Sequence, residues 1–337
     1  MKKILVLVLI CCVIVLTSCK KEEEAATKES IPSFLRFELD GDGYIVYCDD
    51  NSVVNVEIPS KYNGKSVVAI GEYSFIDCSY LTSITIPNSV LSIGEGAFSN
   101  CSSLKSITLP NGLITIGSQA FSNCASLEKI VFPLSIEIID ENAFHNCNKL
   151  KYNEYKNGKY LGNEENPYLV LNGLIQNNIT SFEFNDDCKI IGDSVFKDCS
   201  NLEEVILPKN ITSLGRSAFY HCTSLTNIIL PESVKSIGKF TFGECYNLNN
   251  IVIPVGVKYI GYSAFVGCGS LTSIVIPESV VSIDEIAFLG CSSLKTVFNN
   301  SLLEIKAGDD YYKIPLTAQI FNKGEWSFFN GVPTPNK

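Results

Sequence analysis

Hydrophobic residues recur along most of the chain at intervals of 23 residues. Each interval carries a cysteine, with phenylalanine three residues before it and leucine three residues after it. The leucine is followed by Ile or Val three residues later in most copies and then by a proline, so that the unit reads Leu-x-x-Ile-x-Ile-Pro, then Val-x-x-Ile-Gly and the next Ala-Phe-x-x-Cys. A fixed period of this length is the signature of a repeat architecture. The cysteines that mark it are Cys78, Cys101, Cys124, Cys147, Cys199, Cys222, Cys245, Cys268 and Cys291.

Each interval predicts one short strand followed by a corner. Alternation within Ile-x-Ile puts successive side chains on opposite faces, and the proline ends the strand because it has no N–H for the ladder. The Ile-Gly pair predicts a corner where glycine takes a positive φ. Burial of the few apolar side chains in one interval does not offset an ordering cost of roughly 1.5 kcal/mol per residue. The intervals must therefore stack, which predicts a repeat solenoid, a right-handed superhelix with short strands.

The inward positions of these intervals predict the core. Cysteine at such a position acts as a small hydrophobe, so we expect buried free thiols. Excluding Cys11, Cys12 and Cys19 leaves an odd number of cysteines, and parallel side chains on stacked intervals suit disulfides poorly, although bridges stay an alternative. No Cys-x-x-Cys occurs, which argues against a metal site. The predicted core residues are Phe98, Cys101, Leu104, Ile107, Phe121, Cys124, Phe219 and Cys222.

The repeats define the domain boundaries. Their strand phases run from about residue 53 to 299, and one divergent copy between Cys147 and Cys199 holds six extra residues, with an insertion within 151–178. An open solenoid end would expose its core, so the flanking segments 31–52 and 300–337 are predicted to cap the array.

The Ile-Pro, Val-x-x-Ile-Gly and Ala-Phe-x-x-Cys-x-x-Leu segments together resemble the BspA-type leucine-rich repeat. The insertion fits too, since Asn166-Pro167-Tyr168 resembles a segment often seen in those proteins. This resemblance implies a curved leucine-rich-repeat solenoid and a bacterial surface protein that acts in adhesion or host interaction. It implies no catalytic residues.

The N-terminus resembles an export signal. Lys2 and Lys3 precede an apolar run from 4 to 16, which is shorter than the roughly 18 to 20 residues that span a bilayer. Leu16-Thr17-Ser18-Cys19 resembles the lipobox of bacterial lipoproteins. We therefore expect a signal peptide over 1–18 and a lipidated Cys19, whose acyl chains would hold the protein on a membrane. A plain secretory signal is the alternative.

Residues 19–30 are predicted to form a flexible tether because they are polar and charged. Their run Glu22-Glu23-Glu24 resembles the signal that sends some Gram-negative lipoproteins to the cell surface. The expected location is the bacterial outer membrane, lipid-anchored and surface-exposed. A solvated linker without such a signal is the alternative, and the sequence does not decide the leaflet.

The amino-acid composition argues against several classes of function. With 26 Lys and Arg against 36 Asp and Glu, the net charge of -10 disfavours nucleic acid as a partner. Only two histidines occur, and no acid, base and nucleophile set emerges from the motifs. We predict that the chain is not an enzyme and uses no cofactor.

Binding surfaces are predicted at two places. One outward strand position changes from Thr85 and Thr108 to apolar residues in later copies, which predicts an apolar stripe, although β-branched residues also favour strands when half exposed. The insertion offers tyrosines such as Tyr155 and Tyr160, for recognition or simply for packing. The stripe residues are Ile206, Ile229, Val252, Val275 and Phe298.

We expect a protein partner, on a host cell, in the host matrix or on another bacterium. A glycan is the alternative partner, for which the tyrosine-rich insertion would be the binding site.

Overall fold

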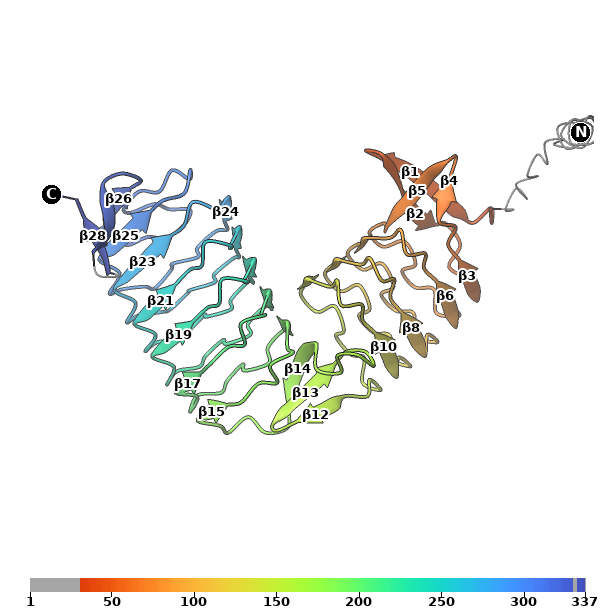
Figure 1. Ribbon diagram of the computed structural model, residues 1–337, viewed down its shortest axis with the longest axis horizontal. Coiled ribbons are helices and arrows are strands. Elements are labelled where there is room, and N and C mark those ends of the chain that lie inside the picture. Colours follow the sequence, from red (N-terminus) through yellow and green to blue (C-terminus); the bar gives the residue numbers. More distant parts are fainter. Residues whose placement is uncertain (1–30, 330–331, 337) are drawn as a thin grey trace, which may run out of the picture. The chain divides into compact units, whose positions relative to one another are not determined.

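Each 23-residue interval forms one turn, or rung, of a solenoid (Figure 1). The computed structural model describes residues 31–329 and 332–336, and those from Phe34 onward form one unit. The predicted repeat solenoid is confirmed, with short parallel strands that pair from rung to rung. The predicted signal peptide over 1–18, Cys19 and the tether up to residue 30 lie outside the described residues.

The Ile-x-Ile segments form the strands that we call the face ladder. From β8 onward, paired residues are 23 positions apart and all pairs are parallel, which is the register that the repeat requires. The face-ladder strands are β3 (Asn55–Glu57), β6 (Ser83–Thr85), β8 (Ser106–Thr108), β10 (Lys129–Val131), β15 (Ser181–Phe182), β17 (Glu204–Val205), β19 (Asn227–Ile229), β21 (Asn250–Val252), β23 (Ser273–Ile276), β25 (Thr296–Asn299) and β26 (Gln319–Asn322).

The segments before each Ile-Gly corner pair into a second set of strands, the corner ladder. This ladder consists of two separate sheets. The first ends at β11, and the second begins with the strands of the insertion. The first holds β1 (Leu35–Asp40), β2 (Gly43–Cys48), β5 (Lys65–Ile70), β7 (Ser92–Ile93), β9 (Thr115–Ile116) and β11 (Ile138–Ile139), with β4 (Lys61–Tyr62) beside β5. The second holds β12 (Asn153–Tyr155), β13 (Gly158–Leu161), β14 (Val170–Leu174), β16 (Ile190–Ile191), β18 (Ser213–Leu214), β20 (Ser236–Ile237), β22 (Tyr259–Ile260) and β24 (Ser282–Ile283).

The core lies between the two ladders and consists of columns of identical side chains. All eight predicted core residues are buried, none more than 3% exposed. The phenylalanines stack in two columns, with ring centroids 5.2 Å apart between Phe75 and Phe98 and 5.6 Å apart between Phe219 and Phe242. Each ring thus fills the space above the ring of the preceding rung, which explains why the same residue recurs at this position.

The repeat cysteines form hydrogen bonds between rungs, which explains why cysteine recurs at the same position of successive rungs. In seven rungs the Cys Sγ donates to the carbonyl of the phenylalanine 26 residues earlier, at 3.0–3.2 Å; examples are Cys101 to Phe75 and Cys245 to Phe219. All eleven cysteines of the described residues are free, and ten of them are buried. A small apolar side chain with a weak donor suits this position, since it fills space and satisfies a buried carbonyl.

The thiol ladder predicts a specific pattern of reactivity. In the native chain we expect the buried thiols to resist a thiol reagent while half-buried Cys48 reacts, because attack requires an exposed thiolate. Under denaturing, non-reducing conditions all eleven should react. Titration with dithionitrobenzoate checks this, and absence of reactive thiols in the denatured chain would contradict the assignment.

The Ile-Gly corners differ from our prediction. Gly94, Gly117 and Gly215 do not take a positive φ. A Cβ added at Gly94 would instead lie 2.6 Å from the main-chain nitrogen of Glu72 in the preceding rung, so glycine is needed because the rungs approach closely. Positive φ values occur elsewhere in the rung, as at Asn100 (63°) and Asn123 (60°) just before the cysteines. Asparagine tolerates this conformation better than most residues.

Both ends of the array carry hairpins. At the N-terminal end β1 and β2 pair antiparallel, and Leu35 and Val46 join the core of the first rungs. At the C-terminal end the array continues beyond the predicted limit at residue 299, because β26 pairs in parallel with β25 at the regular spacing. The hairpin of β27 (Trp326–Phe329) and β28 (Val332–Pro335) follows. Within the described residues, no helix is long and apolar enough to cross a membrane.

Candidate binding surface

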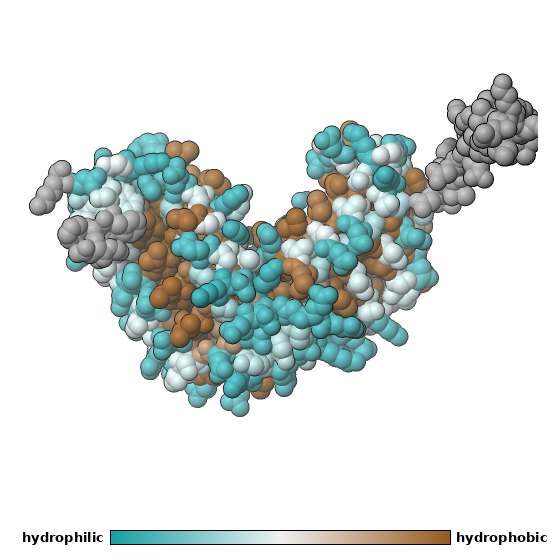
Figure 2. Space-filling view, in the orientation of Figure 1, coloured by the Kyte–Doolittle hydropathy of each residue, from teal (hydrophilic) through white to brown (hydrophobic). Residues whose placement is uncertain are grey.

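The outward positions of the face ladder form a partly apolar surface in the C-terminal half. Ile206 and Ile229 are each 74% exposed and Val252 is 57% exposed, while their neighbours Val205, Leu207 and Ile228 are buried. Ile206 pairs with Ile229, and Ile229 with Val252, so the three side chains lie side by side on adjacent rungs. Figure 2 shows hydrophobic residues gathered over β19, β21 and β23.

The stripe is shorter than predicted. Val275 is half-buried, and Phe298 is only 4% exposed, so the prediction that Phe298 is a contact residue is wrong. Its ring lies 5.6 Å from that of Phe321 and 5.1 Å from that of Trp326, measured between centroids. The additional rung and the hairpin that follows it therefore cover this position. We call Ile206, Ile229, Val252 and Val275 the apolar stripe from here on.

The stripe leads into a groove. A space of about 500 Å³ lies where β21, β23 and β25 meet the C-terminal hairpin, and it is lined by Val252, Val275, Phe298, Phe321 and Pro333. At the equivalent outward position in the N-terminal half, Thr85 and Thr108 are polar and exposed, and Val131 is apolar but half-buried. An apolar surface that ends in an apolar groove is thus confined to one half of the array.

The two tyrosines predicted in the insertion have different environments. Tyr160 is fully buried in the core of the C-terminal half, and its hydroxyl accepts a hydrogen bond from the Asn185 N–H at 3.3 Å. Burial raises the pKa of Tyr160 well above its ordinary value. The prediction that Tyr160 contacts a partner is therefore wrong, because its ring packs in the core. Tyr155 is half-buried in the hairpin, with its hydroxyl 3.4 Å from Glu183.

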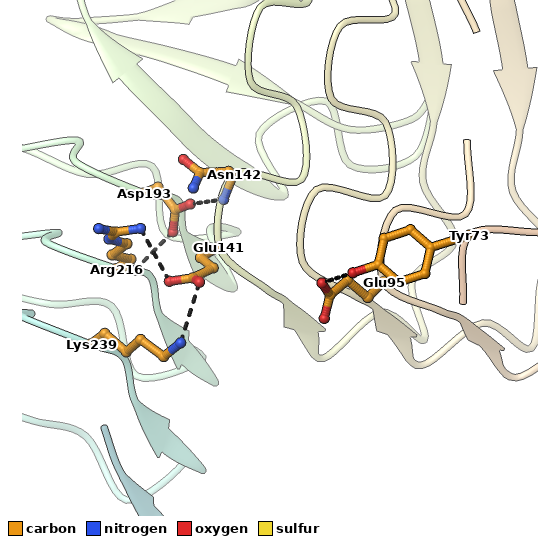
Figure 3. Close-up of polar contacts among 7 residues, drawn as sticks. All are labelled: Tyr73, Glu95, Glu141, Asn142, Asp193, Arg216 and Lys239. Carbon is orange, nitrogen blue, oxygen red and sulfur yellow. Dashed lines mark hydrogen bonds and ion pairs between the residues drawn. The ribbon is translucent and has the colours of Figure 1, made fainter. Parts of the chain in front are cut away.

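A polar junction, which the sequence did not indicate, joins the two corner sheets. Glu141, just after β11, forms ion pairs with Arg216 (3.4 Å) and Lys239 (3.3 Å) beyond β18 and β20 (Figure 3). Asp193 accepts hydrogen bonds from the main-chain N–H groups of Asn142 and Arg216, the second at 2.8 Å. These contacts connect residues up to 98 positions apart. All four charged residues directly follow the corner position of their rung, but the insertion separates Glu141 from the other three in the sequence.

Asp193 gives the junction a dependence on pH. Burial raises the pKa of this carboxyl to about 6, and the charge of Glu141 adds to the shift, while the two main-chain donors and Arg216 oppose it. A carboxyl whose pKa is raised by folding holds its proton more tightly in the folded chain than in the unfolded one. Its stabilising contribution is therefore complete below the ordinary pKa of 3.8 and is lost as the pH rises through about 6.

The Asp193→Asn variant tests this sign. From about pH 4 to pH 7 we expect the free energy of unfolding of the wild type to fall relative to that of the variant by on the order of 2 kcal/mol. Urea unfolding at a series of pH values measures it. Replacement of exposed Asp186 by Asn is the matched control. A wild type that gains stability relative to Asp193→Asn as the pH rises would contradict the account.

The described residues offer little material for metal chemistry. No group of three or more His, Cys, Asp or Glu side chains within 31–329 and 332–336 is placed to hold a metal ion.

Together, the stacked rungs, the parallel face ladder and the columns of phenylalanine and cysteine define a leucine-rich-repeat solenoid. The chain belongs to the BspA type leucine rich repeat region family, whose model matches residues 48–164 and 174–295 in six copies. The break between the two matches falls in the insertion.

Several solved structures are similar to this chain. A leucine rich cell surface protein from Faecalibacterium prausnitzii is 24% identical, covers 79% of this chain and 93% of its own, and gives a TM-score of 0.42. A leucine-rich repeat protein from Bacteroides ovatus is 25% identical over 87% of this chain and 99% of its own, with a TM-score of 0.36. The pneumococcal vaccine antigen PcpA is 19% identical over 87% and 93%, with a TM-score of 0.45. A search of curated proteins found no match.

Proposed function

We propose that the chain is a non-catalytic cell-surface lipoprotein that binds a macromolecular partner, most favourably a protein, through the apolar stripe. The observation that carries the proposal is the exposure of Ile206, Ile229 and Val252 on adjacent rungs. Exposed apolar side chains gathered in this way mark interaction sites more often than isolated ones do. The stripe is built on paired strands whose inward neighbours are buried, so it is held rigid before binding.

The surroundings of the stripe also suit a protein partner. Glu204, Asn227 and Asn250 form an exposed polar column beside it, at the other outward position of the same strands. Protein interfaces commonly combine an apolar centre with a polar rim. Full burial of one Ile or Val side chain contributes about 1.5–3 kcal/mol, so three such residues supply a substantial share of a binding energy.

The location belongs to the same proposal. Cys19 as a lipidated N-terminus, followed by a polar tether, would place the solenoid outside the cell on the outer membrane, where partners on host cells, in the matrix or on other bacteria are within reach. Protease treatment of intact cells, followed by detection of this chain, tests the location. A chain that stays intact while a known surface protein is cleaved would contradict surface exposure.

The double variant Ile229→Lys/Val252→Lys tests the binding surface. We expect it to abolish binding to the partner found on a panel of purified host matrix and bacterial surface proteins, because two charges would be buried without partners. Its thermal midpoint should change little, since both side chains are exposed. The matched control is Thr85→Lys/Thr108→Lys, which alters the same outward position in the N-terminal half and should bind normally.

Equal binding by both double variants would contradict the stripe as the site. Binding on a glycan array, with none on the protein panel, would instead support the glycan alternative. Half-buried Tyr155 in the insertion would then be the next residue to replace.

A further inference from the structure

A groove of about 1120 Å³ lies beside β10, between the face ladder and the insertion. The outward side of β8 and β10 forms one wall, with Lys105, Lys129 and Val131. The loop after β13 forms the other, with Leu161, Asn163 and Glu164. This volume is slightly above the usual range of about 300–1,000 Å³ for ligand sites, and no part of the apolar stripe contributes to it.

The face ladder is interrupted at this groove (Figure 1). Among the described strands β10 pairs with β8 alone, so its other edge is open. The Lys129 N–H donates to the Lys105 carbonyl at 3.4 Å, and the Leu109 N–H donates to the Val131 carbonyl at 3.1 Å. Because successive residues of a parallel strand bond to opposite sides, the N–H and C=O of Ile130 point away from β8 and toward the groove.

Residues of the insertion form hydrogen bonds with both ends of this open edge. The Lys151 N–H donates to the Glu128 carbonyl at 3.0 Å, and the Asn163 side-chain amide donates to the Phe132 carbonyl at 2.7 Å. Lys151 follows Glu128 by 23 residues, so the next rung begins in the regular register. The chain then turns away, because β12 pairs antiparallel with β13 and not with β10. The place of one strand is left open between the two tied ends.

We propose that this groove binds an extended segment of another protein, which adds to β10 as a parallel strand. The Ile130 N–H would donate to a carbonyl of the segment, and the N–H two residues further along the segment would donate to the Ile130 carbonyl. A polypeptide fits this edge because it carries a donor and an acceptor at the spacing of the ladder, which is how strand addition works in other proteins.

The walls of the groove indicate which side chains the segment carries. Lys105 and Lys129 are exposed on one wall and Glu164 and Glu165 on the other, and none of the four forms an ion pair with another described residue. A segment with an acidic residue toward β10 and a basic residue toward the insertion would pair with both. The central residue, facing inward, would meet buried Leu161 and Phe132 and should therefore be apolar.

A synthetic peptide with the sequence of residues 270–277, Ser-Leu-Thr-Ser-Ile-Val-Ile-Pro, is the probe for the main-chain pairing, because the open place has the register of a rung strand. It has no charged side chain, so its binding does not depend on the charges of the walls. Bound like a rung, its valine N–H would donate to the Ile130 carbonyl and its central isoleucine would point inward. We expect saturable binding to the mature chain by fluorescence anisotropy, and slower hydrogen exchange of the Ile130 amide. N-methylation of the valine should weaken binding at least tenfold.

The matched control is N-methylation of the isoleucine that precedes the valine. Its N–H would point away from β10, so this modification should change binding less than twofold. The Ile229→Lys/Val252→Lys variant should bind the peptide like the wild type, so failure of this proposal and failure of the stripe are distinguishable. No binding, equal effects of the two N-methyl groups, or an unprotected Ile130 amide would overturn the proposal. Concentration-dependent protection of that amide without peptide would overturn it too, because a second copy of the chain would then be the occupant.

Discussion

Replacing Phe219 by alanine is expected to lower the free energy of unfolding by about 3–5 kcal/mol. The ring is fully buried between those of Phe196 and Phe242, at centroid distances of 4.9 and 5.6 Å. Truncation would leave a cavity that neither neighbour can fill, since the Phe196 and Phe242 N–H groups are held by hydrogen bonds to the Ala218 and Ala264 carbonyls of the following rungs. Urea unfolding followed by circular dichroism measures the loss.

Ile229→Ala is the matched control for this prediction, because Ile229 stands in the strand that follows Phe219 in the chain but points outward. Its effect on the free energy of unfolding should stay within about 0.5 kcal/mol. Similar losses for the two variants would mean that the phenylalanine column does not hold the rungs together.

Raising the pH above about 9 is expected to destabilise the chain steeply, since 9.0 is the ordinary pKa of a cysteine thiol. Burial raises the pKa of Cys101, Cys245 and Cys291 to about 12, and that of Cys199 to about 11. The stability due to these protonated thiols is complete below about pH 9 and is lost as the pH rises through the folded values. Each thiol contributes a slope of about 1.4 kcal/mol per pH unit, and the ladder contributes several times that.

The Cys245→Ala variant isolates the thiol contribution from that of tyrosine and lysine, which titrate in the same range. Its free energy of unfolding, measured with reductant between pH 8 and pH 11, should fall with a slope about 1.4 kcal/mol per pH unit shallower than that of the wild type. Identical slopes for the two proteins would show that the Cys245 thiol is not protected in the folded chain.

The period of the sequence predicted the core because inward and outward positions repeat with it. Phe98, Cys101 and Leu104 occupy the same phase in their rung as Phe219, Cys222 and Leu225 do in theirs, and all are buried. Stacking of like on like is sufficient to place such residues. The predicted reason for glycine in the corners, a positive φ, was wrong. The sequence pattern does not show how closely successive rungs approach one another.

The two site residues that were predicted wrongly, Phe298 and Tyr160, lie where the regular 23-residue repeat is interrupted or ends. Phe298 has the outward phase, but a further rung without the Phe-x-x-Cys motif and a hairpin with Trp326 cover it. Tyr160 belongs to the insertion, where no phase says which side chain points inward. The signal for the additional rung was present as Ile320 and Phe321, placed 23 residues after Val297 and Phe298.

Contacts across the insertion could not be predicted, because the repeat period does not show how the rungs on its two sides meet. The junction of Glu141 with Arg216 and Lys239, and the groove beside β10, both arise because the insertion interrupts the regular pairing of strands. Where β12 departs from the register of β10, the chain loses one strand of the ladder. The irregular segment therefore creates the larger of the two grooves described above, whereas the regular rungs create the apolar stripe.

Residue-resolved hydrogen exchange of the full chain tests the stacked array most directly. We expect the slowest amides to recur every 23 residues, at the phenylalanines of successive rungs such as Phe196, Phe219 and Phe242, whose N–H groups donate to the following rung. Protection that follows no such period, or that is absent from these amides while other segments are protected, would contradict it.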